Sequence, residues 1–156
     1  MPWTTQYFSN GAALRFEGTT TGDEIYRSKL EVLAHDFPDR PRFILCDFTP
    51  VETFAVTPND IDRLVELFRR AEPQIRDFSI AVVAPQPIEY GLARMWEISV
   101  EGGGFRTSVV HTRPEALHWL TARRVTPLPP DDSAGTRTSG ASRQDEWRKE
   151  ERRGEA

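Results

Sequence analysis

Apolar and polar residues alternate in regular patterns along the first four-fifths of the chain. Two short stretches, 4–9 and 12–17, flank an Asn-Gly pair at 10–11. An Asn-Gly pair between two alternating stretches predicts an antiparallel hairpin. In the second stretch, Leu14 and Phe16 are expected to face inward.

Four later segments carry apolar residues at the 3.6-residue spacing of a helix. Thr21 and Glu24 have the spacing of a capping box, and Thr57 is expected to cap the second helix. Gly91, inside the third helix, is expected where that helix packs closely on a sheet. The residues predicted to face the core are Ile25, Tyr26, Lys29, Leu30 and Leu33; Ile61, Leu64, Val65 and Phe68; Ile88, Leu92, Met95 and Trp96; and Ala116, Leu117 and Leu120.

Three apolar runs, 43–48, 78–84 and 105–111, alternate with these helices. Such runs are typical of parallel strands covered on both faces. The segment 49–56 is expected to be a loop. The order β-β-α-β-α-β-α-β-α predicts an α/β domain with a mixed, mostly parallel five-stranded sheet, an N-terminal antiparallel hairpin and flanking helices.

The composition changes near Val125. A proline-rich stretch, 127–130, is followed by small polar residues and then by a segment of mixed charge. These compositions are typical of a stiff spacer and of disordered chain. We therefore expect one folded domain at 1–124 and a disordered linker and charged tail at 125–156.

Composition and charge narrow the class of protein. The net charge of the 156 residues is −4, without the basic surplus of a nucleic-acid-binding domain. No apolar stretch reaches the roughly 20 residues that a membrane span needs. The start, 1–6, lacks the pattern of a signal peptide, and one cysteine allows no disulfide within the chain. A cytoplasmic protein is expected.

Two motifs resemble a known family. Residues 88–96 read Ile-Glu-Tyr-Gly-Leu-Ala-Arg-Met-Trp, and 115–120 read Glu-Ala-Leu-His-Trp-Leu. With the order of elements and the strand 43–48, they resemble the SpoIIAA-like proteins over roughly Tyr7 to Ala122. These small bacterial proteins are grouped with STAS domains and, at the level of fold, with CRAL-TRIO lipid-binding domains. The resemblance implies a STAS-like fold.

The resemblance also directs attention to the start of the second helix. In signalling STAS proteins, a serine in an Asp-Ser-Ser-Gly motif is phosphorylated at that place. Here residues 54–60 read Phe-Ala-Val-Thr-Pro-Asn-Asp, so the motif is missing. Thr57 is the nearest hydroxyl, and helix capping explains it.

A candidate ligand site follows from the predicted sheet. Ligands of open α/β sheets bind beyond the carboxyl ends of the parallel strands, and helix N-termini there favour anions. This rule brings together Asp47, Thr49, Thr57, Tyr90 and Arg94 as a site for a small anion. In the alternative interpretation these residues are structural: they hold a loop, cap a helix, pack, or pair with a carboxylate.

No residue set predicts catalysis, a metal or a cofactor. Cys46 lies within an apolar strand, and His35, His111 and His118 lack the spacing of metal ligands. We therefore expect a non-enzymatic regulatory or protein-interaction module with a protein partner or a second copy of itself. The alternative is a carrier or sensor of a small apolar or anionic, lipid-like ligand, which would need a pocket of roughly 300 Å3 or more.

Overall fold

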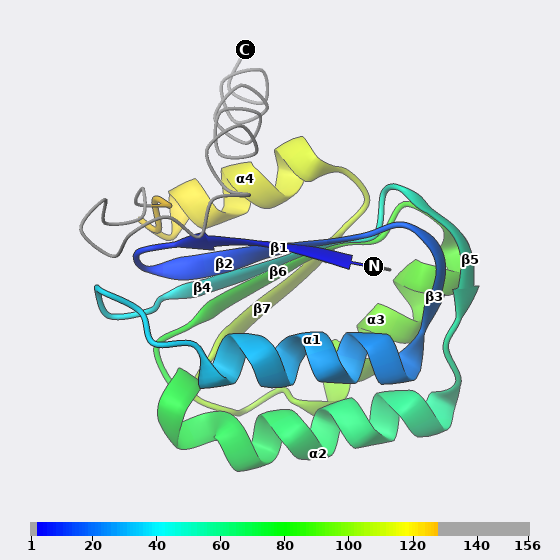
Figure 1. Ribbon diagram of the computed structural model, residues 1–156, viewed down its shortest axis with the longest axis horizontal. Coiled ribbons are helices and arrows are strands. Elements are labelled where there is room, and N and C mark those ends of the chain that lie inside the picture. The colour runs from blue at the N-terminus through cyan, green and yellow to red at the C-terminus, as the bar shows by residue number, and fades with distance from the viewer. Residues whose placement is uncertain (1–2, 128–156) are drawn as a thin grey trace.

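Five strands form the main sheet of the computed structural model, which describes residues 3–127 (Figure 1). The strand order is β1-β2-β4-β6-β7, with β1 antiparallel to β2 and the other neighbours parallel. The predicted α/β architecture with its N-terminal hairpin is therefore confirmed. The strands are β1 (Trp3–Phe8), β2 (Gly11–Phe16), β4 (Phe43–Asp47), β6 (Ser79–Val83) and β7 (Arg106–Val110).

Helices cover both faces of the sheet. The helices α1, α2 and α3 connect consecutive parallel strands and lie on one face, whereas α4 follows the last strand and lies on the other (Figure 1). Each of the three crossovers moves along the sheet in the same direction, so right-handed connections place all three helices on one side. The bounds are α1 (Gly22–Ala34), α2 (Pro58–Ile75), α3 (Pro87–Ser99) and α4 (Arg113–Ala122).

A second, two-stranded parallel sheet lies where the parallel strands of the main sheet end (Figure 1). It consists of β3 (Gly18–Thr21) and β5 (Val51–Ala55). The prediction of a loop over 49–56 was therefore wrong for most of that segment. Most of β5 faces solvent, so it has no apolar run of its own, and its strand conformation depends on a partner distant in the sequence.

The N-terminal hairpin turns one residue earlier than the Asn-Gly pair suggests. Phe8 pairs with Gly11, so the two turn residues are Ser9 and Asn10, and neither has a positive φ. Gly11 is instead the first residue of β2. A Cβ atom built there would lie 2.3 Å from a ring carbon of Phe43. Glycine is needed at this position because the neighbouring strand approaches closely.

The buried faces of two helices differ from the predicted ones. In α1, Leu30 is 42% exposed, and Val32 is buried instead. In α3, Ile88 and Met95 are exposed, and Glu89 faces the core. Both helices carry apolar residues on more than one side, so periodicity alone did not identify the side that contacts the sheet.

Gly91 was also placed on the wrong side of α3. It is exposed, and no heavy atom outside its own neighbourhood lies within 4 Å of a Cβ atom built on it. Gly91 therefore does not mark a close approach of α3 to the sheet.

The described chain continues briefly past α4. Val125 is 2% exposed, and the Asn10 side-chain amide donates a hydrogen bond of 2.9 Å to the Thr126 carbonyl. The predicted disorder of the tail concerns mostly residues 128–156, which lie outside the described range. Within that range, no helix has the length and apolar character to cross a membrane.

Candidate functional site

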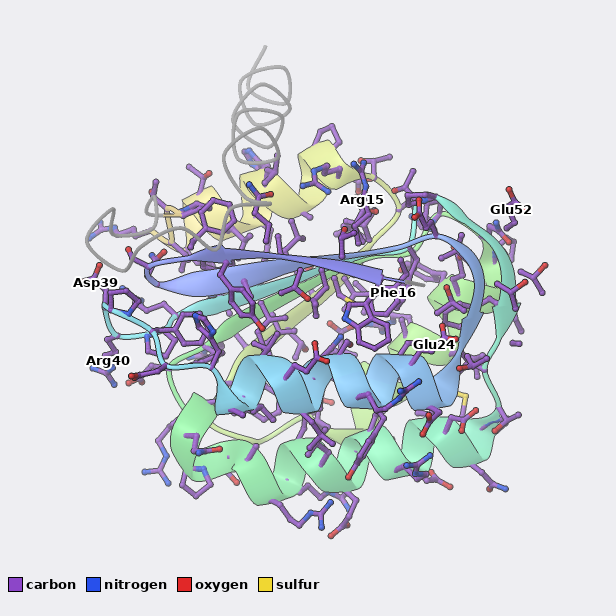
Figure 2. All side chains as sticks on the ribbon, viewed as in Figure 1. Arg15, Phe16, Glu24, Asp39, Arg40 and Glu52 are labelled. Carbon is purple, nitrogen blue, oxygen red and sulfur yellow. The ribbon has the colours of Figure 1, made fainter. Side chains whose placement is uncertain are left out.

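Asp47 lies at the carboxyl end of β4 and is 1% exposed. One carboxylate oxygen accepts a hydrogen bond of 2.8 Å from the Thr49 amide. The other pairs with Arg113 at the start of α4 and lies 3.8 Å from the Arg15 Nε atom. Figure 2 shows Arg15 on the α4 side of β2 and Phe16 on the α1 side. Asp47 therefore links β2, β4 and α4, and both of its oxygens are occupied by contacts within the protein.

The connections after β6 and β7 part to opposite faces of the sheet. The first leads to α3 and the second to α4, and such a divergence is where open α/β sheets form a ligand crevice. Here the Tyr90 ring stacks on His111, with ring centres 4.2 Å apart and planes 10° from parallel. This aromatic pair spans the two connections. His111 was missed because sequence spacing does not relate it to Tyr90.

Thr57 caps α2. Its hydroxyl oxygen accepts a hydrogen bond of 3.2 Å from the Asp60 amide, and an Asp60 carboxylate oxygen accepts one of 2.9 Å from the Thr57 amide. The predicted cap is therefore confirmed, and Asp60 completes a capping box.

Arg94 is half-exposed on α3 and pairs with Glu97 one turn further on. Among the five predicted site residues, a hydrogen bond joins Asp47 to Thr49. Thr57 bonds Asp60, Tyr90 stacks on His111, and Arg94 pairs with Glu97. Their joint role in binding a small anion remains a prediction.

Replacing Thr57 by alanine tests the capping interpretation. Thr57→Ala is expected to lower the free energy of unfolding by about 1 kcal/mol because the Asp60 amide loses its acceptor. Thr57→Ser keeps the hydroxyl and is expected to stay close to wild type. Urea unfolding followed by circular dichroism measures both. An unchanged stability of Thr57→Ala would show that the hydroxyl serves another purpose.

Glu89 is a buried carboxyl group in the first turn of α3, with an exposure of 0%. Its Oε1 atom accepts a hydrogen bond of 2.9 Å from the Gln86 amide, and its Oε2 atom has no partner among the described residues. Burial raises the pKa of Glu89, and the nearby charge of Asp47 raises it further. The spacing of Gln86 and Glu89 is that of a capping box, the signal that could have identified this carboxyl group.

The raised pKa of Glu89 makes stability depend on pH. As the pH rises from about 4.5, the ordinary pKa of a glutamate, the unfolded chain loses this proton before the folded one. Unfolding therefore becomes easier until the pH passes the folded pKa. Glutamine has no proton to lose, so Glu89→Gln does not lose stability in this way. The free energy of unfolding of Glu89→Gln, minus that of wild type, should therefore increase between pH 4.5 and pH 7.

Urea unfolding at several pH values measures this difference. The exposed Glu101→Gln variant is the control for the removal of one carboxyl group. If the difference in free energy of unfolding between Glu89→Gln and wild type does not change with pH, the pKa of Glu89 is not raised.

Within residues 3–127, no three His, Cys, Asp or Glu side chains converge to hold a metal ion. A cavity of about 40 Å3 lies between the main sheet and the helices α1, α2 and α3. It is much smaller than the roughly 300 Å3 of a pocket for a lipid-sized ligand. The residues that line it include Lys29, Cys46, Phe54, Leu64, Ile80 and Trp96.

Comparison with known proteins yields a likeness of fold. No protein-family model matches the chain, and no curated protein is significantly similar to it. Among solved structures, it is similar to an uncharacterized protein of the DUF3478 family with a SpoIIAA-like fold from Shewanella loihica PV-4. The two share 14% identity over 76% of this chain and 91% of the other, with a TM-score of 0.46.

Proposed function

We propose that the protein is a non-catalytic interaction module that acts through the exposed face of α3. The observation that carries this proposal is the placement of its exposed apolar side chains. Among residues 3–127, the large apolar side chains that are exposed are Leu30, Ile88, Met95 and Ile98. Three of these four lie on α3. Single exposed apolar residues are ordinary, whereas a group of them on one helix is typical of a contact surface.

The three residues form one stripe. At 100° per residue, Ile88, Met95 and Ile98 fall within an arc of about 80° on α3. Gly91 falls within the same arc, and the space above it is open. The opposite side of the helix buries Trp96 and its neighbours against the sheet. The α3 stripe, defined as Ile88, Gly91, Met95 and Ile98, is therefore a second apolar face that the rest of the described chain leaves uncovered.

The α3 stripe is complementary to itself. Ile88 and Ile98 lie five residues on either side of Ala93, and Gly91 and Met95 lie two residues on either side. Two copies packed with antiparallel α3 helices would place each Met95 above Gly91 of the other copy, and each Ile88 opposite Ile98. A two-fold interface needs such matching between a surface and itself. We therefore infer that the partner is a second copy of the chain.

Two buried groups support the non-catalytic part of the proposal. Glu89, in the first turn of α3, and Asp47, at the carboxyl end of β4, are 0% and 1% exposed. A general acid or base must reach its substrate within hydrogen-bond distance. Both groups are instead covered by the protein and engaged in contacts that hold the connections in place.

Sedimentation across a range of concentrations tests the proposal. One helix face buries less area than a standard interface, so the dimer should be weak, with a dissociation constant of about 10 μM to 1 mM. Met95→Glu places a charge in the centre of the α3 stripe and is expected to give a monomer throughout. Leu30→Glu, at the exposed apolar residue of α1, is the matched control and should dimerise like wild type.

Two results would overturn the proposal. One is a wild-type protein that remains monomeric at about 1 mM, the upper end of the range expected for such an interface. The other is a dimer that Met95→Glu leaves intact, which would place the interface elsewhere.

A further inference from the structure

Three arginines lie at the end of the sheet where β6 and β7 begin. Arg106 is the first residue of β7, and Arg123 and Arg124 directly follow α4. Arg106 and Arg124 are exposed, and Arg123 is partly buried. None of the ion pairs found among residues 3–127 includes any of the three. A protein with a net charge of −4 therefore carries three cations here without a carboxylate partner in the described part of the chain.

Ser79, the first residue of β6, connects two of these arginines. Its side chain is buried, and its hydroxyl oxygen accepts a hydrogen bond of 3.2 Å from Arg123 Nε. Ser79 also pairs with Arg106 in the parallel register of β6 and β7, and neighbouring strands lie about 4.8 Å apart. Both side chains point to the α4 face, since Ala81 and Val110, an even number of residues further along, contact the cluster under α4. Arg106 and Arg123 therefore lie beside the same buried hydroxyl group.

Arg123 is held in one orientation. Besides its hydrogen bond to Ser79, its guanidinium lies over the Trp119 ring, 5.3 Å from the ring centre. Because Nε is occupied by Ser79, the two Nη groups remain as donors, and they have no acceptor among the described residues. The Ser79 hydroxyl can donate as well as accept. A guanidinium that is already fixed loses little further freedom when it binds an oxyanion.

Arg124 adopts a backbone conformation that favours glycine. Its φ is 60°, and among residues 3–127 it is the one residue other than glycine with a positive φ. The Arg124 amide donates to the Thr121 carbonyl, and the next amide donates to the Leu120 carbonyl. This is the Schellman motif, in which glycine usually holds the place of Arg124. The dipole of α4 stabilises a nearby cation by no more than the left-handed conformation costs, so the helix end alone does not explain an arginine here.

We propose that Ser79, Arg106, Arg123 and Arg124 form a binding site for a phosphate group. The guanidinium groups of Arg106 and Arg123 donate charge-assisted hydrogen bonds to its oxygens, and the Ser79 hydroxyl donates another. Arg124 adds a third positive charge. Three cations and a hydroxyl match a doubly charged tetrahedral oxyanion better than they match a carboxylate. Because Arg106 and Arg124 are exposed, one phosphate oxygen can carry an organic substituent, as in a phosphomonoester.

The phosphate site and the α3 stripe are independent of each other. The site lies on the face of the sheet that α4 covers, whereas α3 lies on the other face (Figure 1). The Met95→Glu variant, which should be monomeric, is therefore expected to bind phosphate as tightly as wild type. Dimerisation and phosphate binding can thus fail separately.

Titration with inorganic phosphate and with O-phosphoserine at about pH 7.5, where both are mostly dianions, tests the proposal. NMR of the arginine Nε–H signals follows the binding. The Arg123 signal, identified by its loss in Arg123→Lys, should move as the guanidinium gains an anion. A ligand of so few atoms should bind with a dissociation constant of about 0.1–10 mM. Sodium chloride at equal ionic strength is the control for screening, and acetate is the control for a singly charged oxyanion.

Three variants separate binding from stability and from net charge. Arg106→Gln should weaken phosphate binding about tenfold, because a charge-assisted hydrogen bond is lost. Arg124→Gly removes a charge and suits the positive φ. It should weaken binding about threefold and raise the melting temperature by about 3 °C. Arg76→Gln removes an exposed arginine that follows α2, on the other face of the sheet, and should leave binding unchanged.

The outcomes distinguish a phosphate site from general attraction of anions. Phosphate binding that Arg106→Gln and Arg124→Gly weaken, and Arg76→Gln does not, would support the proposal. Tighter binding of phosphoserine than of inorganic phosphate would then assign the site to phosphomonoesters, and the reverse order would assign it to free phosphate. Equal responses to phosphate, acetate and chloride would overturn the proposal. An unmoved Arg123 signal at about 100 mM phosphate, well above the expected dissociation constant, would overturn it as well.

Discussion

Asp47→Asn is expected to lower the free energy of unfolding by about 3 kcal/mol, or the melting temperature by about 10 °C. The carboxylate is 1% exposed and pairs with the Arg113 guanidinium, whose side chain is 15% exposed. Asparagine keeps the size of the side chain and an acceptor for the Thr49 amide. It lacks the negative charge, so Arg113 remains mostly buried without its carboxylate. Loss of one member of a buried ion pair costs more than the pair itself contributes.

The matched control for Asp47→Asn is Asp77→Asn. Asp77 pairs with Arg40, and the two side chains are 53% and 75% exposed. An exposed pair contributes little, so this variant should stay within about 0.5 kcal/mol of wild type. Urea unfolding at pH 7 compares the two variants. Equal, small losses would contradict the role of Asp47 in linking β2, β4 and α4, and would favour its role in binding a ligand.

Gly11→Ala is expected to destabilise the protein by about 2 kcal/mol or more, because it places a methyl group within 2.6 Å of three atoms of Phe43. The new Cβ atom would be 2.3 Å from a ring carbon of Phe43 and 2.6 Å from its carbonyl oxygen. Gly11 pairs with Phe43 in the parallel register of β2 and β4. The carbonyl cannot move without disturbing that pairing, and the Phe43 ring is 0% exposed.

The same substitution at Gly91 should have the opposite effect. Gly91 lies inside α3, and the space that an added methyl group would occupy is open. Alanine there is expected to stabilise the protein by about 0.5–1 kcal/mol, since glycine loses more backbone freedom on folding. Unfolding at a few micromolar, below the concentrations expected for dimerisation, avoids any effect on the α3 stripe. If Gly11→Ala does not lower the free energy of unfolding, β2 and β4 can move apart at little cost in free energy.

Local signals along the sequence were sufficient for the order of the main elements. The apolar runs at 43–48 and 78–84 predicted buried parallel strands, and the structure has β4 and β6 there. Thr21 and Thr57 predicted the starts of α1 and α2, and both form capping boxes. These predictions succeeded because each depends on residues within a few positions of one another, where backbone preference and capping chemistry act directly.

Contacts between distant residues decided the rest of the candidate site. Asp47 pairs with Arg113, 66 residues away, and Tyr90 stacks on His111 from another connection. The strand β5 forms only because β3 lies beside it. The local sequence pattern does not predict these pairings, because several residues elsewhere in the chain have the same chemistry as the actual partner.

The sequence by itself determined the α/β class, the order of the main strands and the caps of α1 and α2, because these follow from short-range periodicity and hydrogen bonding. Only the tertiary structure decided which side of α3 is buried. Helical periodicity shows that α3 has apolar residues on more than one side, but not which side contacts the sheet. In the structure Glu89 and Trp96 are buried, and Ile88 and Met95 are exposed. That choice, made by packing between layers, created both the α3 stripe and the cavity beside Lys29.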